Sequence, residues 1–460
     1  MEANVIKYSS KRFSRVWTSG EESELIRELD RTLTEGEEQS YLQTAWMGRG
    51  CYKNYGDGFI FLKGVGPTEG GEIFRGIMDK FWKGRSPVQK GGCVRLNTRD
   101  FPILIEYFYK SEREIEVFDP RPEGYSIYGA VLREAVISDY LYSKGFYIPR
   151  PVAVYRTDLA SEWETGNREE MAKYCYDAFL KVMNVPGDTA VNISKIQYED
   201  PKAGLFVRLF DSEIRLQEIV EVYIHHEEKL AELSRELDLV AKRDGAGSWT
   251  RMFSRGMIKN LVTFLKYGII HSNLETHYQN FSLRGEICDW DAAIIHKSFP
   301  CASEFKSILK SADGKYDAEM MLYYEEDERA HEDYATFAIR QIYAIINSCM
   351  FAERIKAEAV GREWSASDVE RVERELICDL IGEADDFVLS ELTRLSKCAP
   401  DCEYRYKMVG RTSILGWNCY PRHKDYSAYI CKESDRLAIV RDVNKMMELI
   451  GSAVSERGRG

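Results

Sequence analysis

The segment YGIIHSNLETHYQNFSLRGEICDWDAAII (267–295) contains the highest concentration of residues with potential chemical roles. An apolar helix leads into it, and a loop rich in His, Asn, Glu and Gln follows. The segment FSLRGEICDW then predicts two short strands joined by a turn at Arg284-Gly285. Asp289 ends the second of these strands, so we expect its carboxylate to lie close to the polar loop.

Carboxylate and amide oxygens in this stretch predict a site for a divalent metal. Mg²⁺ prefers hard oxygen ligands, and in phosphate-transferring enzymes a few protein oxygens hold it against the phosphates of a nucleotide. We therefore predict Asn280 and Asp289 as metal ligands. Asp291 fits either a further metal ligand or a surface residue. A polar turn with no catalytic role is the alternative for the whole loop.

The spacing inside the loop resembles that of protein kinases. In those enzymes a catalytic acid is followed, after four intervening residues, by a metal-binding Asn, and Glu275 and Asn280 have this spacing. Asp289 then takes the place of the metal-binding Asp, and ICDWDAA (287–293) is similar to the corresponding segment of the aminoglycoside kinases. The usual acid is Asp, whereas this chain has Glu275, and His277 is a second candidate for the acid–base group.

The N-terminal region contains three further features that kinase-like enzymes need. These enzymes use a glycine-rich turn over the phosphates, a strand lysine, and a helix glutamate that holds the lysine. The segment MGRGCYKNYGDG supplies Gly48 and Gly50, FIFLKG supplies Lys63, and VLREAVISDYL supplies Glu134. Each feature alone also fits an ordinary turn or a solvated side chain. Their order along the chain, together with the polar loop, predicts a nucleotide site.

The order of strand-like and helix-like segments predicts the fold class. Strand-like segments concentrate in the first third of the chain, and helical spacing dominates after about residue 212. This order predicts an α+β protein with a protein-kinase-like two-lobed fold, in which a small sheet-rich N-lobe and a large helical C-lobe enclose the ligand. We expect a helical extension over 1–40, the N-lobe over 41–157 and the C-lobe over 158–460. Long helices are expected over 217–243, 328–359, 366–395 and 433–455.

Composition narrows the classes of partner. The chain has 460 residues, of which 44% are hydrophobic and 30% charged, as is typical of globular proteins. Its net charge of −12 argues against general DNA or RNA binding, because phosphate contacts need a basic surface. The 11 cysteines show no disulfide framework, and neither a signal peptide nor an apolar stretch long enough to span a membrane is recognised. We therefore expect a cytoplasmic protein with no membrane or nucleic-acid partner.

Four segments, taken in order, resemble the selenoprotein O family of kinase-like proteins. They are FLKGVGPT (61–68), GAVLREAVISDYLYSKGFYIPRPVAVY (129–155), FVRLFDSEIRL (206–216) and YGIIHSNLETHYQN (267–280). The resemblance implies ATP and Mg²⁺ as cofactors, and transfer of AMP rather than phosphate to a protein hydroxyl. It implies that Lys63 contacts phosphates and that Glu134 positions Lys63. It also implies that Arg208 and Arg215 hold phosphates as forked cations.

Departures from the family pattern leave further activities open. The segment between the lysine block and the helix block is much longer than in the family, and the polar loop is longer too. The loop also resembles that of siderophore synthetases, which use ATP to adenylate a carboxylate. A phosphotransferase acting on a small molecule or a protein is an alternative, although Glu275 in place of the usual Asp argues mildly against an ordinary kinase. A nucleotide-binding pseudokinase scaffold is a further alternative, and the presence of Lys63, Glu134, Asn280 and Asp289 argues against it. The sequence does not determine the acceptor, because fold-level resemblance does not determine a substrate.

Overall fold

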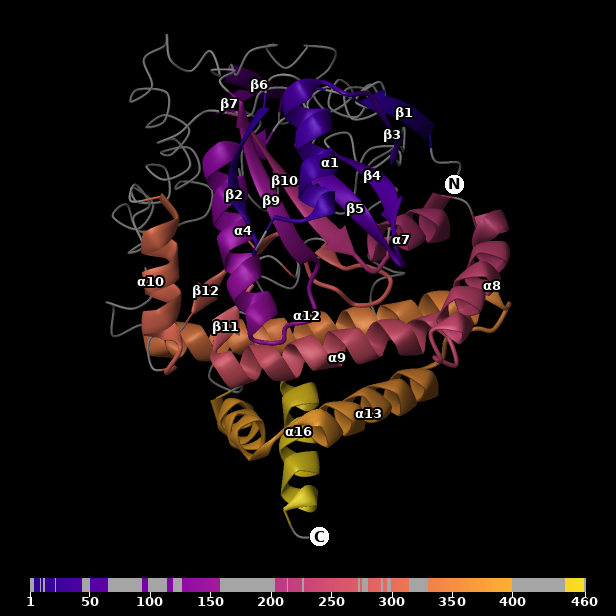
Figure 1. The fold of residues 1–460 in the computed structure, drawn as a ribbon. Coiled ribbons are helices and arrows are strands. Elements are labelled where there is room, and N and C mark those ends of the chain that lie inside the picture. Colours follow the sequence, from indigo (N-terminus) through magenta and orange to yellow (C-terminus); the bar gives the residue numbers. More distant parts are fainter. Residues whose placement is uncertain are drawn as a thin grey trace.

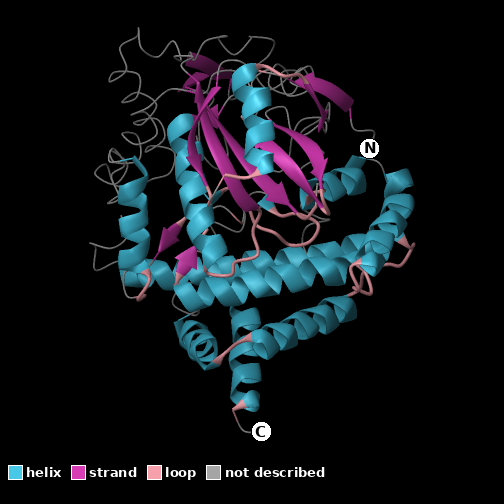
Figure 2. Ribbon diagram, viewed as in Figure 1, coloured by secondary structure: helices cyan, strands magenta, loops and turns pink. Residues whose placement is uncertain are grey.

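The computed structural model describes residues 4–8, 10, 13–20, 22–43, 50–64, 93–97, 114–118, 126–157, 203–212, 214–225, 227–271, 274, 280–290, 293–295, 299–313, 330–398 and 443–458. Within these residues the chain is a mixed α+β protein, with an antiparallel sheet from the first half of the chain and a helical C-terminal part (Figure 1). Figure 2 shows the strands gathered on one side of a layer of long helices.

The main sheet of the described chain has eight strands. In chain order they are β1 (Asn4–Tyr8), β2 (Phe13–Thr18), β3 (Gln39–Gln43), β4 (Gly50–Tyr55), β5 (Gly58–Lys63), β8 (Ser126–Ile127), β9 (Arg150–Thr157) and β10 (Ala203–Phe210). Their order across the sheet is β1-β3-β4-β5-β10-β9-β2, with β8 also paired to β10, and the pairings are antiparallel. Branched and aromatic residues dominate the central strands, which suits a surface buried on both faces.

Helices cover both faces of the sheet. On one face, α1 (Glu24–Asp30) and the π-helical turn η1 (Arg31–Glu35) pack their leucines and Ile26 against one set of alternate residues of β5 and β10. On the other face, α4 (Tyr128–Ser143) packs against Val154 and Phe206. Because successive strand residues point to opposite faces, α4 lies on the face that carries the second set of alternate residues.

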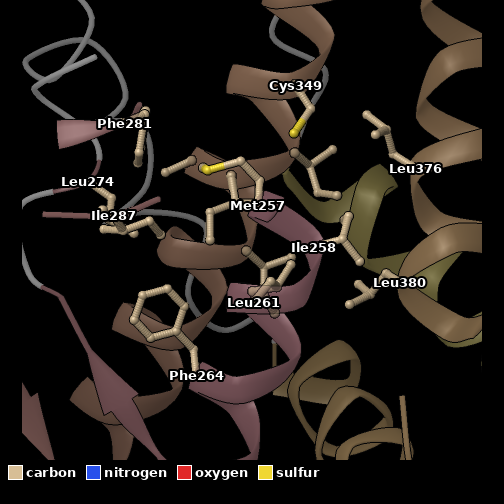
Figure 3. Packing of buried hydrophobic residues seen from close by; sticks show 14 of the residues in the cluster. Met257, Ile258, Leu261, Phe264, Leu274, Phe281, Ile287, Cys349, Leu376 and Leu380 are labelled. Atoms are coloured by element: carbon tan, nitrogen blue, oxygen red, sulfur yellow. The ribbon is translucent and has the colours of Figure 1, made fainter. Parts of the chain in front are cut away.

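The C-terminal part is organised around α9 (Trp249–Tyr267), which contacts α8 (Glu227–Arg243), α12 (Ala330–Ala359) and α13 (Ala366–Glu383). Figure 1 shows α9 and α12 side by side beneath the sheet. In Figure 3, the residues Leu274, Phe281 and Ile287 lie on one side of α9, and Leu376 and Leu380 of α13 lie on the other. The remaining elements used below are α7 (Leu216–His225), α10 (Ala302–Asp313), α16 (Val443–Arg457), and the strand pairs β6 (Cys93–Asn97) with β7 (Glu114–Phe118) and β11 (Ile269–Ile270) with β12 (Ile294–Ile295).

The sheet reaches beyond the expected N-lobe boundaries. The segment 1–40, expected as a helical extension, does contain α1, but its strands β1 and β2 pair with β3 and β9 in the main sheet. Strand β10 lies between β5 and β9, although it falls after the expected boundary at residue 157. Local patterns in the sequence predict that a strand exists, but the partner of a strand depends on contacts between distant segments.

Two of the expected long helices are divided in the structure. The segment 217–243 forms α7 and α8, with residue 226 outside the described residues. The segment 366–395 is interrupted at Ala384-Asp385, where the Asp385 side chain accepts a hydrogen bond from Val388 N at 3.0 Å and so begins a new helix. The helix expected over 328–359 is confirmed as α12. None of the helices in the described ranges is both long and apolar enough to cross a lipid bilayer.

Candidate functional site

Four charged side chains from distant parts of the chain meet between the sheet and α4. Lys63 Nζ, at the end of β5, donates hydrogen bonds to Glu134 Oε2 at 2.7 Å and to Asp289 Oδ1 at 2.6 Å. Arg208 on β10 donates to Glu134 Oε1, and the Asp289 amide donates to the same oxygen at 3.1 Å. Lys63 and Asp289 are 226 positions apart in the sequence, so only the tertiary structure brings them together. We call Lys63, Glu134, Arg208 and Asp289 the charged quartet.

The register of two strands puts the cations of the quartet on one face of the sheet. In the antiparallel pair of β5 and β10, Phe206 lies opposite Lys63, and Arg208 lies opposite Phe61. Residues two apart on a strand share a face, so Lys63 and Arg208 project to the same side. Helix α4 crosses this side and buries Glu134 at 0% exposed. A buried carboxylate is stable only with cationic or N–H partners, and three donors reach Glu134.

A tight hairpin from Asn280 to Cys288 leads into Asp289. Cys288 N donates to Asn280 O at 3.0 Å, and the bridge between Phe281 and Ile287 closes the hairpin. The turn includes Gly285 with a φ of 82°, a left-handed conformation that favours glycine. The hairpin predicted from FSLRGEICDW is therefore confirmed, with isolated bridges in place of full strands. It brings the backbones of Asn280 and Asp289 to the same end of the hairpin.

The backbone and the charge of Asp289 are both unusual. Its φ of 73° lies in the left-handed region, which Asp and Asn tolerate better than other residues with side chains. Burial alone would raise the pKa of Asp289, but the Lys63 ammonium and the Arg208 guanidinium hold that pKa well below its ordinary value. The carboxylate is therefore ionised at neutral pH, which is the form that a metal ligand needs.

The oxygen atoms at this end of the hairpin are of the kind that Mg²⁺ prefers. Asn280 offers an amide oxygen and Asp289 a carboxylate, and Mg²⁺ in nucleotide enzymes commonly takes one or two carboxylates together with phosphates and waters. Within the part of the chain that the structure describes, no group of three or more His, Cys, Asp and Glu side chains could hold a metal ion.

Arg215 is buried beside Arg208 of the quartet, and the two residues are 8% and 3% exposed. Their guanidinium carbons lie 5.1 to 5.4 Å from the ring centres of Phe61 and Phe210, so two cations share the same two rings. Arg215 Nη1 donates to Cys288 Sγ at 3.1 Å. Burial raises the pKa of the Cys288 thiol, so Arg215 contacts a neutral sulfur rather than a thiolate.

Gly50, predicted as a phosphate-binding glycine, has a packing reason for its small size. A Cβ atom at this position would lie 2.4 Å from two atoms of the Phe61 ring. A side chain at position 50 would therefore require the Phe61 ring to move, whether or not a phosphate approaches this position. Four other predicted site residues lie outside the described part of the chain, namely Gly48, Glu275, His277 and Asp291. Their roles stay predictions from the sequence.

Sequence reasoning missed Asn260, which hydrogen-bonds the turn of the hairpin that precedes Asp289. Its Nδ2 donates to the carbonyls of Tyr147 at 2.7 Å and Gly285 at 3.0 Å, and it is 0% exposed. The sequence did contain a signal for it. Asn260 lies on the same helical face as Met257 and Leu261, and a polar residue on an apolar face needs hydrogen-bond partners in the core.

Comparison of the chain with protein-family models gives no match, and comparison with curated proteins gives none either. Function must therefore be inferred from the residues and the geometry of the site. The quartet places an ionised carboxylate beside an ammonium and a guanidinium, and the Arg215 guanidinium lies close by. Such a set of charges can hold phosphate oxygens and a divalent metal at the same time.

Proposed function

We propose that this chain is an ATP- and Mg²⁺-dependent transferase with a protein-kinase-like two-lobed fold. The observation that carries the proposal is the contact of Lys63 with both Glu134 and Asp289. A strand lysine, a helix glutamate and an aspartate after a hairpin meet in the order that kinase-like enzymes require. The sheet-bearing first half of the chain and its helical C-terminal part are the two lobes of this proposal.

Each residue of the site has a distinct task in this proposal. Asn280 and Asp289 hold Mg²⁺ through their oxygen atoms, and the bound metal neutralises charge on the phosphates of ATP. Lys63 exchanges its contact with Asp289 for a phosphate oxygen, because an ammonium is a compact cation with three donors. Glu134 keeps Lys63 within reach of the phosphates.

The buried Arg215 supports transfer of AMP over transfer of phosphate. The acceptor oxygen attacks the α-phosphorus, forming an O–P bond while the bond from that phosphorus to the oxygen of pyrophosphate breaks. The proton of the acceptor passes to Glu275 or His277, the residues that the sequence predicts for this task. The leaving pyrophosphate is a compact polyanion that cations stabilise, and the guanidinium of Arg215 adds a positive charge close to Lys63.

The test is incubation with Mg²⁺ and ATP that is labelled separately at the α and γ phosphates, beside the Asp289→Asn variant. Asn is chosen because it tolerates the φ of 73° at this position, whereas Ala would add backbone strain. Label transferred from the α position, with release of pyrophosphate and loss of both in the variant, supports AMP transfer. Label transferred from the γ position contradicts it and identifies a phosphotransferase.

Two additions to this experiment distinguish a carboxylate-adenylating ligase from a nucleotide-binding scaffold. Hydroxylamine captures an activated carboxylate as a hydroxamate. ATP-dependent formation of a hydroxamate from a carboxylate acceptor would therefore identify adenylation of the siderophore-synthetase type. A rise in Tm on addition of ATP and Mg²⁺, together with no transfer of label to proteins or small molecules, would identify a nucleotide-binding scaffold. The Asp289→Asn variant is expected to lose the metal-dependent part of that shift.

A further inference from the structure

We infer that Arg208 is a positioning residue that permanently neutralises Glu134 and thereby frees Lys63 to exchange between Asp289 and a phosphate. The inference rests on the proposed function, and it refines the roles within the same site. It also gives Arg208 a task other than the phosphate contact that the family resemblance implies. Arg208 acts through Glu134 and touches no substrate.

The two oxygens of Glu134 have different cationic partners. Oε2 accepts a hydrogen bond from Lys63 Nζ at 2.7 Å. Oε1 accepts from Arg208 Nη1, and also from the Asp289 amide at 3.1 Å. Because each oxygen has its own cation, Lys63 can leave Oε2 while Oε1 remains paired with Arg208.

Exposure divides the quartet into an inner pair and an outer pair. The side chains of Arg208 and Glu134, the inner pair, are 3% and 1% exposed. The side chains of Lys63 and Asp289, the outer pair, are 20% and 27% exposed. A ligand from solvent can therefore reach the outer pair, whereas the inner pair is buried from solvent and its two charges depend on each other.

Aromatic rings fix the Arg208 guanidinium in its contact with Glu134. Its Cζ lies 5.1 Å from the ring centre of Phe206, 5.3 Å from that of Phe61 and 5.4 Å from that of Phe210. A guanidinium stacks favourably on such rings and keeps its charge under all physiological conditions. For Arg208 to bind a phosphate, it would have to leave both the rings and the carboxylate.

The second cation matters at the moment when Lys63 moves. Without Arg208, departure of Lys63 would leave the buried Glu134 carboxylate with neither of its two cations. An uncompensated buried charge is strongly unfavourable, and that penalty would oppose movement of Lys63 toward a phosphate. With Arg208 in place, Glu134 stays neutralised whether Lys63 faces Asp289 or a ligand.

Steady-state kinetics with ATP and Mg²⁺ test this assignment in Arg208→Met. We expect kcat to fall at least about tenfold while KM for ATP changes less than about twofold, because Lys63 is mispositioned but the contacts to ATP remain. Arg208→Lys is expected to recover part of kcat. Arg156→Met is the matched control. Arg156 lies on the neighbouring strand β9, and its Cζ is 5.3 Å from the ring centre of Tyr128. The kinetics of this variant should equal those of the wild type. A KM for ATP raised about tenfold with unchanged kcat would overturn the inference.

Thermal unfolding without nucleotide keeps the inference testable even if the proposed function fails. We expect Arg208→Met to lower Tm more than Lys63→Met does. In Lys63→Met the buried Arg208 still neutralises Glu134, whereas in Arg208→Met the more exposed Lys63 is the cation that remains. We also expect the Tm loss of the Glu134→Gln/Arg208→Met double variant to be smaller than the sum of the single losses. If Arg208→Met does not fold, Arg208→Gln, which is also uncharged, replaces it in both measurements. Additive losses, or a larger loss for Lys63→Met, would overturn the inference.

Discussion

Asn260 of α9 hydrogen-bonds both backbone groups of Tyr147, accepting from its amide at 2.9 Å and donating to its carbonyl at 2.7 Å. Tyr147 lies in the connection between α4 and β9, and the same Asn260 amide group also reaches the carbonyl of Gly285 in the hairpin turn. One side chain of α9 thereby ties the end of the helix that carries Glu134 to the hairpin that leads into Asp289.

Asn260→Ala is expected to lower the free energy of unfolding by about 3 kcal/mol, because buried backbone groups of two segments lose their partner. Unfolding in urea, followed by circular dichroism, measures the change. Thr263→Ala on the same helix is the control. The Thr263 hydroxyl only donates to the Lys259 carbonyl of its own helix, at 2.8 Å, so we expect a loss below about 0.5 kcal/mol. Equal losses in both variants would contradict the role given to Asn260.

Gly256 lets the hairpin turn touch the backbone of α9. A Cβ at Gly256 would lie 2.0 Å from the Arg284 carbonyl oxygen. Gly256→Ala is therefore expected to lower the free energy of unfolding by about 2 kcal/mol or more, although Ala favours helices. A Cβ at Gly382 of α13 would meet no other part of the described chain within 4 Å, so Gly382→Ala should raise the free energy of unfolding by about 0.5 kcal/mol. Denaturant unfolding of both variants should give opposite signs, and a shared sign would refute the packing explanation.

Glu286 provides a prediction for the pH dependence of stability. Burial raises the pKa of Glu286 from its ordinary 4.5 to about 7, Asp211 adds to the rise, and Arg284 opposes it. The folded chain therefore keeps a proton that the unfolded chain has already released. The stabilising contribution is complete below pH 4.5 and is lost as the pH rises through about 7.

The measurement for Glu286 compares wild type with Glu286→Gln, which cannot titrate. Relative to that variant, the free energy of unfolding of the wild type should fall by up to about 3 kcal/mol between acidic and mildly alkaline pH. Urea unfolding at several pH values across this window gives the difference. A difference that stays constant with pH would contradict the raised pKa of Glu286.

Gly50→Ala separates a packing role from a nucleotide-binding role for the predicted glycine-rich turn. We expect a loss of about 1–3 kcal/mol in stability, because the added methyl group meets the Phe61 ring. Phe61→Leu in the same chain should remove part of that loss, since the smaller side chain makes room. Thermal unfolding and titration with ATP provide the two readouts. Weaker ATP binding with unchanged stability would instead favour a phosphate contact.

Local sequence patterns were sufficient to predict several elements and the kinds of residue in the site. Strand β10 and helix α12 follow directly from their runs of branched residues and from helical spacing, and α4 ends before Gly145, which has a φ of 84°. The hairpin before Asp289 was predictable because its turn carries a glycine between two apolar runs. These features depend on residues close together in the chain, so the sequence determined them by itself.

Only the tertiary structure decided how those elements combine. The pairing of β2 with β9 and of β10 with β5 joins segments that no local pattern connects, so the extent of the sheet was not predictable. The same applies to the pairing of Arg208 with Glu134, which are 74 positions apart. A charged residue in a strand pattern does not indicate its partner, because burial and register together select which opposite charge it meets. The inner and outer pairs of the quartet, and hence the roles proposed for Arg208 and Lys63, follow from that long-range packing.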